Sequence, residues 1–103
     1  MGNKISVVCV TNRKGSVEFL KKQLDKQTFK DFEVIIADDA ENPKLYDKQF
    51  KPRAKGEGDV WNVNKAYNDC FSRVEGELIV FFQDFIEVPA NGLKRFYDLG
   101  SLS

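Results

Sequence analysis

The sequence predicts an α/β fold, a three-layer α/β/α sandwich around a mainly parallel sheet. Three short, continuous apolar runs, at residues 5–10, 32–37 and 78–82, are typical of strands that are buried on both faces. Apolar residues at helical spacing follow the first run and precede the third. Strand, helix and strand in this order make a βαβ unit, whose parallel crossover is almost always right-handed.

The first strand and helix are well marked. Residues 5–10 are β-branched apart from Ser6 and Cys9, and the run is too short for a helix. A polar turn follows, and Ser16 is expected to be the N-cap of a helix that continues to Gln27. The second strand then covers residues 32–37.

The middle of the chain is less regular. Prolines, glycines and lysines interrupt residues 41–59, which predicts a loop with one short strand or turn near residues 46–50. Helical periodicity returns at residues 63–74, and Gly76 suits a helix C-terminal cap.

The last part is predicted to be a strand and a helix. Residues 78–82 form the third strand, and Pro89 suits the first turn of a final helix. On that helix the side chains expected to face inward are Leu93, Phe96 and Tyr97. The phenylalanines of and after the strand, Phe81, Phe82 and Phe85, are most simply explained as core.

Composition limits the class of protein. A chain of 103 residues makes a single domain, 1–103, and 42% hydrophobic with 31% charged residues is typical of a soluble globular protein. Sixteen basic and sixteen acidic residues cancel, which argues against nucleic acid or anionic lipid as a partner. No apolar run has the length of a membrane span. Cys9 and Cys70 fall at core positions, which favours a cytoplasmic protein without structural disulfides.

Acidic residues follow two of the predicted strands: Asp38 and Asp39 after the second, Asp84 after the third. Ligands of open α/β sheets bind outside these strand ends. The acids could simply cap turns. A phosphoacceptor pocket is disfavoured, because its acid pair would follow the first strand, where Thr11 and Asn12 stand. In a nucleotide–metal site, one carboxylate would accept a hydrogen bond from the uracil N–H. Another would bind the Mg²⁺ or Mn²⁺ ion that accompanies the diphosphate.

Basic and aromatic residues of the middle loop are secondary candidates. Lys51, Arg53 and Lys55 could reach diphosphate oxygens or could form a solvated loop. Trp61 could stack on a base or sugar, or anchor the start of the following helix.

At this level of detail the chain resembles the N-terminal, nucleotide-binding half of a family 2 glycosyltransferase with the GT-A fold. The similarity covers nearly the whole chain in order and spacing. It is carried by residues 5–13 (ISVVCVTNR), 27–39 (QTFKDFEVIIADD), 66–68 (AYN) and 76–84 (GELIVFFQD), with Pro89 beyond them.

The resemblance implies transfer of a sugar from a nucleotide-diphosphate donor, with a UDP-sugar favoured, to an unknown acceptor. It places Thr11 and Asn12 on the nucleoside and the pair Asp38–Asp39 on the base, with Asp39 the better acceptor for the uracil N–H. Asp84, with Gln83 beside it, would hold the divalent metal.

Two departures from the family pattern affect this interpretation. Gln83 stands where the family carries a second acid, so one carboxylate and one amide oxygen would hold the metal. Family members are also longer, which implies that the acceptor site and catalytic base lie in a missing half, and no residue here is assigned as the base. The alternative function is a non-catalytic binding or assembly module, and open sheet edges predict a homodimer or a partner chain covering them.

Overall fold

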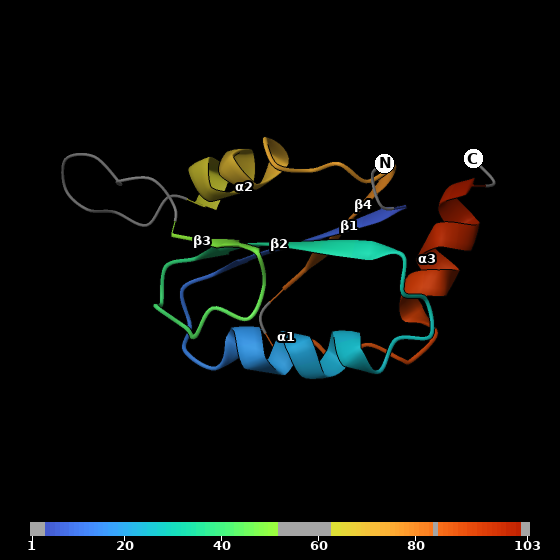
Figure 1. The fold of residues 1–103 in the computed structure, drawn as a ribbon, viewed down its shortest axis with the longest axis horizontal. Coiled ribbons are helices and arrows are strands. Elements are labelled where there is room, and N and C mark those ends of the chain that lie inside the picture. The colour runs from blue at the N-terminus through green and yellow to red at the C-terminus, as the bar shows by residue number, and fades with distance from the viewer. Residues whose placement is uncertain (1–3, 52–62, 84, 102–103) are drawn as a thin grey trace.

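A computed structural model describes residues 4–51, 63–83 and 85–101 of the chain, which fold into three layers (Figure 1). The sheet contains β1 (Ile5–Thr11), β2 (Phe32–Asp38), β3 (Lys48–Phe50) and β4 (Leu78–Phe82) in the order β3-β2-β1-β4, with every pair parallel. The helices are α1 (Ser16–Asp25), α2 (Val63–Phe71) and α3 (Gly92–Ser101). The predicted α/β class with a parallel sheet is confirmed. Among the described residues, no helix has the length and apolar character needed to cross a bilayer.

Strand β1 lies at the centre of the fold. Its residues 5–9 are almost completely buried, and it pairs with β2 along its whole length and with β4 along residues 5–9. Alternate side chains enter different cores. Ile5, Val7 and Cys9 pack with α1 and the start of α3, whereas Val8 packs with α2. One strand therefore contributes to both faces of the sandwich.

Both cysteines lie in these cores, as the sequence predicted, and neither is in a disulfide. Cys70 lies on α2 against Val8 and Ile35 of the sheet. Burial raises the pKa of its thiol to about 11. Cys70 is therefore a packed side chain and a poor nucleophile at neutral pH.

Two predicted helix caps are wrong. The N-cap of α1 is Gly15, whose φ of 86° is left-handed, and Ser16 is the first helical residue. Gly76 is not a C-cap, because α2 ends at Phe71. A Cβ on Gly76 would lie 2.5 Å from Ser6 Oγ and 2.8 Å from the carbonyl carbon of Ile5, so glycine is needed there for close approach of two chain segments.

The predicted burial of the C-terminal aromatics is partly wrong. Leu93 and Phe82 are buried and Tyr97 is half-buried, but Phe81, Phe85 and Phe96 are 51%, 43% and 45% exposed. Helix α3 begins at Gly92, and Pro89 lies in the turn before it. Periodicity identified the elements correctly, but β4 is an edge strand with one uncovered side.

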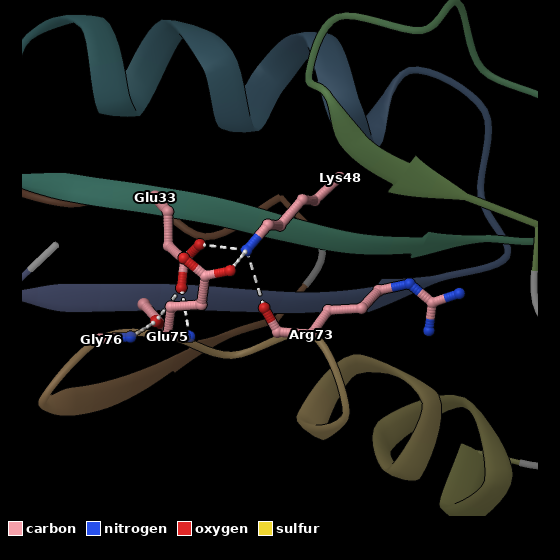
Figure 2. Close-up of polar contacts among 6 residues, drawn as sticks. Glu33, Lys48, Arg73, Glu75 and Gly76 are labelled. Carbon is pink, nitrogen blue, oxygen red and sulfur yellow. Dashed lines mark hydrogen bonds and ion pairs between the residues drawn. The ribbon is translucent and has the colours of Figure 1, made fainter. Parts of the chain in front are cut away.

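A polar network joins three strands to the α2–β4 connection (Figure 2). Glu33 of β2 accepts hydrogen bonds from Lys48 Nζ (2.6 Å), Ser6 Oγ (2.5 Å) and the backbone N–H of Glu75 (2.7 Å). Lys48 also donates to the carbonyl of Arg73 at 2.8 Å. The network holds the end of α2 against the sheet.

Two opposing effects act on the pKa of the Glu33 carboxyl. Burial raises its pKa, but the hydrogen bonds from Lys48, Ser6 and Glu75 and the charge of Lys48 outweigh burial, so the pKa lies below the ordinary value of 4.5. Because the folded pKa is the lower one, ionised Glu33 stabilises the fold above the unfolded pKa. That stability is lost as the pH falls through the folded pKa.

We expect Glu33→Gln to lower the free energy of unfolding at pH 7 by about 1–3 kcal/mol, because charge-assisted hydrogen bonds are lost. Urea titrations at several pH values should show the gap to wild type narrowing below pH 4.5. The matched control is Glu75→Gln, whose carboxylate is 67% exposed and 3.5 Å from Lys48, and which should change stability by less than about 1 kcal/mol. A gap that stays constant with pH would contradict the assigned role of Glu33.

Candidate functional site at the carboxyl edge of the sheet

The carboxyl ends of three adjacent strands meet at one edge of the sheet. Thr11 and Asp38 are register partners at the ends of β1 and β2, and Cys9 is the partner of Phe82 at the end of β4. The N–H of Asp39 donates to the carbonyl of Thr11 at 2.9 Å, which joins the loops after β1 and β2. The strand order reverses between β1 and β4, the position where open α/β sheets bind ligands.

Thr11 holds the turn after β1. Its side chain is buried, its hydroxyl lies 2.7 Å from Ser16 Oγ, and it accepts the N–H of Arg13 at 3.1 Å. Ser16 in turn donates to the carbonyl of Arg13 at 2.8 Å. Asn12 is the exposed side chain of the predicted nucleoside-contacting pair.

The two acids of the pair Asp38–Asp39 differ in their surroundings. Asp38 is buried, and each carboxylate oxygen accepts two hydrogen bonds. The donors are the N–H groups of Ala40 and Asn42, the side-chain amide of Asn42 and that of Gln49, at 2.9–3.1 Å. The hydrogen bonds of Asp38 therefore hold the β2–β3 connection in place. Asp39 is half-buried, and its N–H donates to the carbonyl of Thr11, the residue before Asn12.

Asn42 is a site residue that sequence reasoning missed. Its amide oxygen accepts the N–H of Gly15 at 2.7 Å, and its amide nitrogen donates to the carbonyl of Arg13 at 3.1 Å and to Asp38. It thus joins the turn before α1 to the β2–β3 connection. An asparagine four residues after Asp38 was the only signal, and such a residue is common in any turn.

Gln23 and Gln27 are further contributors that the sequence did not reveal. Both side chains are buried. Gln23 lies on α1 and Gln27 lies just after it, and both form hydrogen bonds with the backbone around the start of α3. Gln23 accepts the N–H of Val88 at 3.0 Å, while Gln27 accepts that of Leu93 at 3.0 Å and donates to the carbonyl of Pro89 at 2.8 Å. The segment that follows β4 is therefore held against the C-terminal end of α1.

The two predicted metal ligands are described only in part. Gln83 is exposed directly after β4, whereas Asp84 lies outside the described residues. Beyond it, the Phe85 ring packs on Phe19 at 5.5 Å between centroids and lies near the Gly15 turn. Among the described residues, no three acidic or cysteine side chains are grouped to hold a metal ion.

A small hollow of about 160 Å³ opens beside the β2–β3 connection. Its polar lining contains both signs of charge, and Lys51 lies 4.0 Å from Glu41 in a well-exposed ion pair. Arg53, Lys55 and Trp61, the other candidates in this loop, lie outside the described residues. The lining residues are Asp38, Glu41, Asn42, Lys44, Gln49, Phe50 and Lys51.

We expect Asp38→Asn to destabilise the fold by about 1–3 kcal/mol, because its new amide N–H₂ would face donors instead of accepting from them. Asp47→Asn is the matched control, since Asp47 is exposed in the turn before β3 and should tolerate the change within about 0.5 kcal/mol. Thermal and urea unfolding measure both. Equal stability of the two variants would show that the Asp38 hydrogen bonds do not hold the loop.

Searches with the sequence and the structure found no matching protein-family model, no matching curated protein and no matching solved structure. The chain's own residues and their geometry are therefore the basis for assigning a function.

Proposed function

We propose that this chain binds a nucleotide-diphosphate sugar, with UDP as the favoured nucleotide, at the carboxyl edge of its sheet. The observation that carries the proposal is the junction of the loops after β1 and β2, next to the strand-order reversal between β1 and β4, where the Asp39 N–H donates to the Thr11 carbonyl at 2.9 Å. The fold is then of the GT-A type, and the site serves transfer of the sugar to an acceptor in the cytoplasm.

Each residue has a distinct proposed role. Asp39 accepts the ring N–H of uracil, and Asn12 contacts the nucleoside. Asp38 is proposed to act from within the loop, where its four hydrogen bonds fix the position of Asp39. Thr11 acts in the same way on the other loop, through its contacts with Ser16 and Arg13.

A divalent cation completes the proposed site. Gln83 and Asp84 offer an amide and a carboxylate oxygen, a donor set that suits Mg²⁺ or Mn²⁺. Two protein oxygens leave the other coordination positions to diphosphate oxygens and water, so nucleotide and metal should bind together. When bound, the cation neutralises charge that develops on the leaving diphosphate.

Calorimetric titration of UDP tests this proposal. We expect binding with Mn²⁺, and at least about tenfold weaker binding to Asp39→Ala, equivalent to about 1.4 kcal/mol. The control Asp47→Ala removes an exposed carboxylate in the turn before β3 and should bind as wild type does. Unchanged UDP affinity in a folded Asp39→Ala protein would contradict the role of Asp39.

Asp84→Asn tests the metal separately. We expect this variant to lose the dependence of UDP affinity on Mn²⁺, because an amide replaces the only proposed carboxylate ligand. Titrations with and without Mn²⁺ measure that dependence. A dependence equal to that of wild type would remove Asp84 from the metal site.

The second candidate function is a non-catalytic assembly module. The observation that favours it is the group of exposed apolar side chains around β4, Phe81 among them. The two candidates differ in their need for metal, since an assembly module requires no Mn²⁺-dependent binding of UDP.

A further inference from the structure

Exposed apolar side chains of this protein gather along β4. Ile79 and Phe81 of the strand are 38% and 51% exposed, and Leu99 of α3 reaches 66%. Of the described large hydrophobic residues that are exposed, all but Leu45 lie on β4, on the segment after it, on α3 or at the end of α2. We call this set the β4 rim: Phe71, Ile79, Phe81, Phe85, Ile86, Phe96 and Leu99.

The β4 rim is hollowed on both sides of the strand. A groove of about 330 Å³ lies between β4 and α3, and an open one of about 560 Å³ lies between β4 and α2. Phe81 lines both grooves and makes edge-to-face contacts with Tyr67 and Phe71 at 5.7 Å. The apolar surface therefore continues around the outer edge of the strand.

The backbone of β4 is also open along that edge. Among the described strands β4 pairs only with β1, and the N–H of Leu78 points inward to the carbonyl of Lys4 at 3.0 Å. Because strand residues alternate in direction, the N–H and C=O groups of Ile79 and Phe81 point away from β1. The other edge is protected, since β3 has three residues and carries Lys48.

We propose that β4 pairs with β4 of a second copy of this chain, antiparallel and centred on Val80, to form one continuous eight-stranded sheet. The outward groups fix this register. Ile79 and the partner's Phe81 exchange hydrogen bonds, and the two Val80 residues face each other as a non-hydrogen-bonded pair. Each Ile79 then lies opposite an aromatic ring on the same face, a favourable cross-strand pair.

Charge complementarity favours a second copy over another partner. β4 carries no charged residue, and the groove beside it contains one acid, Glu87, and one base, Arg95. A second copy presents the same two charges, one of each sign, whereas a partner of one strong charge would meet a like charge. The formal net charge of zero also removes repulsion between copies.

Sedimentation and light scattering of the full chain test the interface. We expect a concentration-dependent dimer, and at least a tenfold weaker dimer for Ile79→Lys, because lysine on an edge strand opposes pairing. Leu45→Lys is the matched control, since Leu45 is 36% exposed outside the β4 rim and its replacement should leave the dimer intact. Far-UV circular dichroism checks that both variants fold. A wild-type monomer at every soluble concentration, or a dimer unaffected by folded Ile79→Lys, would overturn the proposal.

A cysteine pair tests the register. Facing residues of a non-hydrogen-bonded pair have Cα atoms about 4.5 Å apart, within the range a disulfide spans. We expect Val80→Cys to form a covalent dimer with oxidised glutathione, seen on a non-reducing gel. Val7→Cys, at the register partner of Val80 on central strand β1, should stay monomeric on that gel. Absence of the disulfide in a folded Val80→Cys protein would overturn the pairing centred on Val80.

Discussion

The fold depends on the burial of β1 between two strands and two helical layers. Its residues 5–9 leave almost no surface to solvent, and alternate side chains supply the core beneath α1 and the core beneath α2. Because β2 and β4 both pair with this strand in parallel, their carboxyl ends are brought to one edge. The position of the candidate site is thus a consequence of hydrophobic burial and strand direction.

Polar side chains fix the conformation of the connections between strands and helices, which burial alone does not determine. Near the start of the strands, Glu33 holds the α2–β4 connection through Ser6, Lys48 and the backbone of Glu75. At the carboxyl edge, Asp38 and Asn42 do the same for the β2–β3 connection and the start of α1. In each case a largely buried carboxylate collects three or four donors, the condition under which burying a charge is tolerated. These carboxylates define loop geometry at both ends of the sheet.

Sequence periodicity was sufficient to predict the α/β class and the order of the elements, and insufficient for the site. The β-branched run of β1 and the apolar spacing of α1 both reflect burial in the core, and burial leaves a periodic pattern in the sequence. Ser16 and Gly76 were misassigned because caps depend on distant partners, Asn42 for the first helix and Ser6 for the glycine. The sequence did not reveal that Asp38 accepts four hydrogen bonds within its own loop, because its donors become neighbours only when the loop folds. Phe81 and Phe85 look like core residues until the strand order places β4 at an edge.

The two proposed surfaces share β4 and remain independent. The candidate nucleotide site lies beyond the carboxyl end of the strand, at Gln83, whereas the proposed interface uses its outer side at Ile79 and Phe81. Antiparallel pairing points the carboxyl ends of the two β4 strands in opposite directions, so the two sites of a dimer would open at opposite edges of the joined sheet. Neither copy then supplies a residue to the other's site. If the protein binds nucleotide and stays monomeric, only the dimer proposal fails. If it dimerises and does not bind nucleotide, only the nucleotide proposal fails.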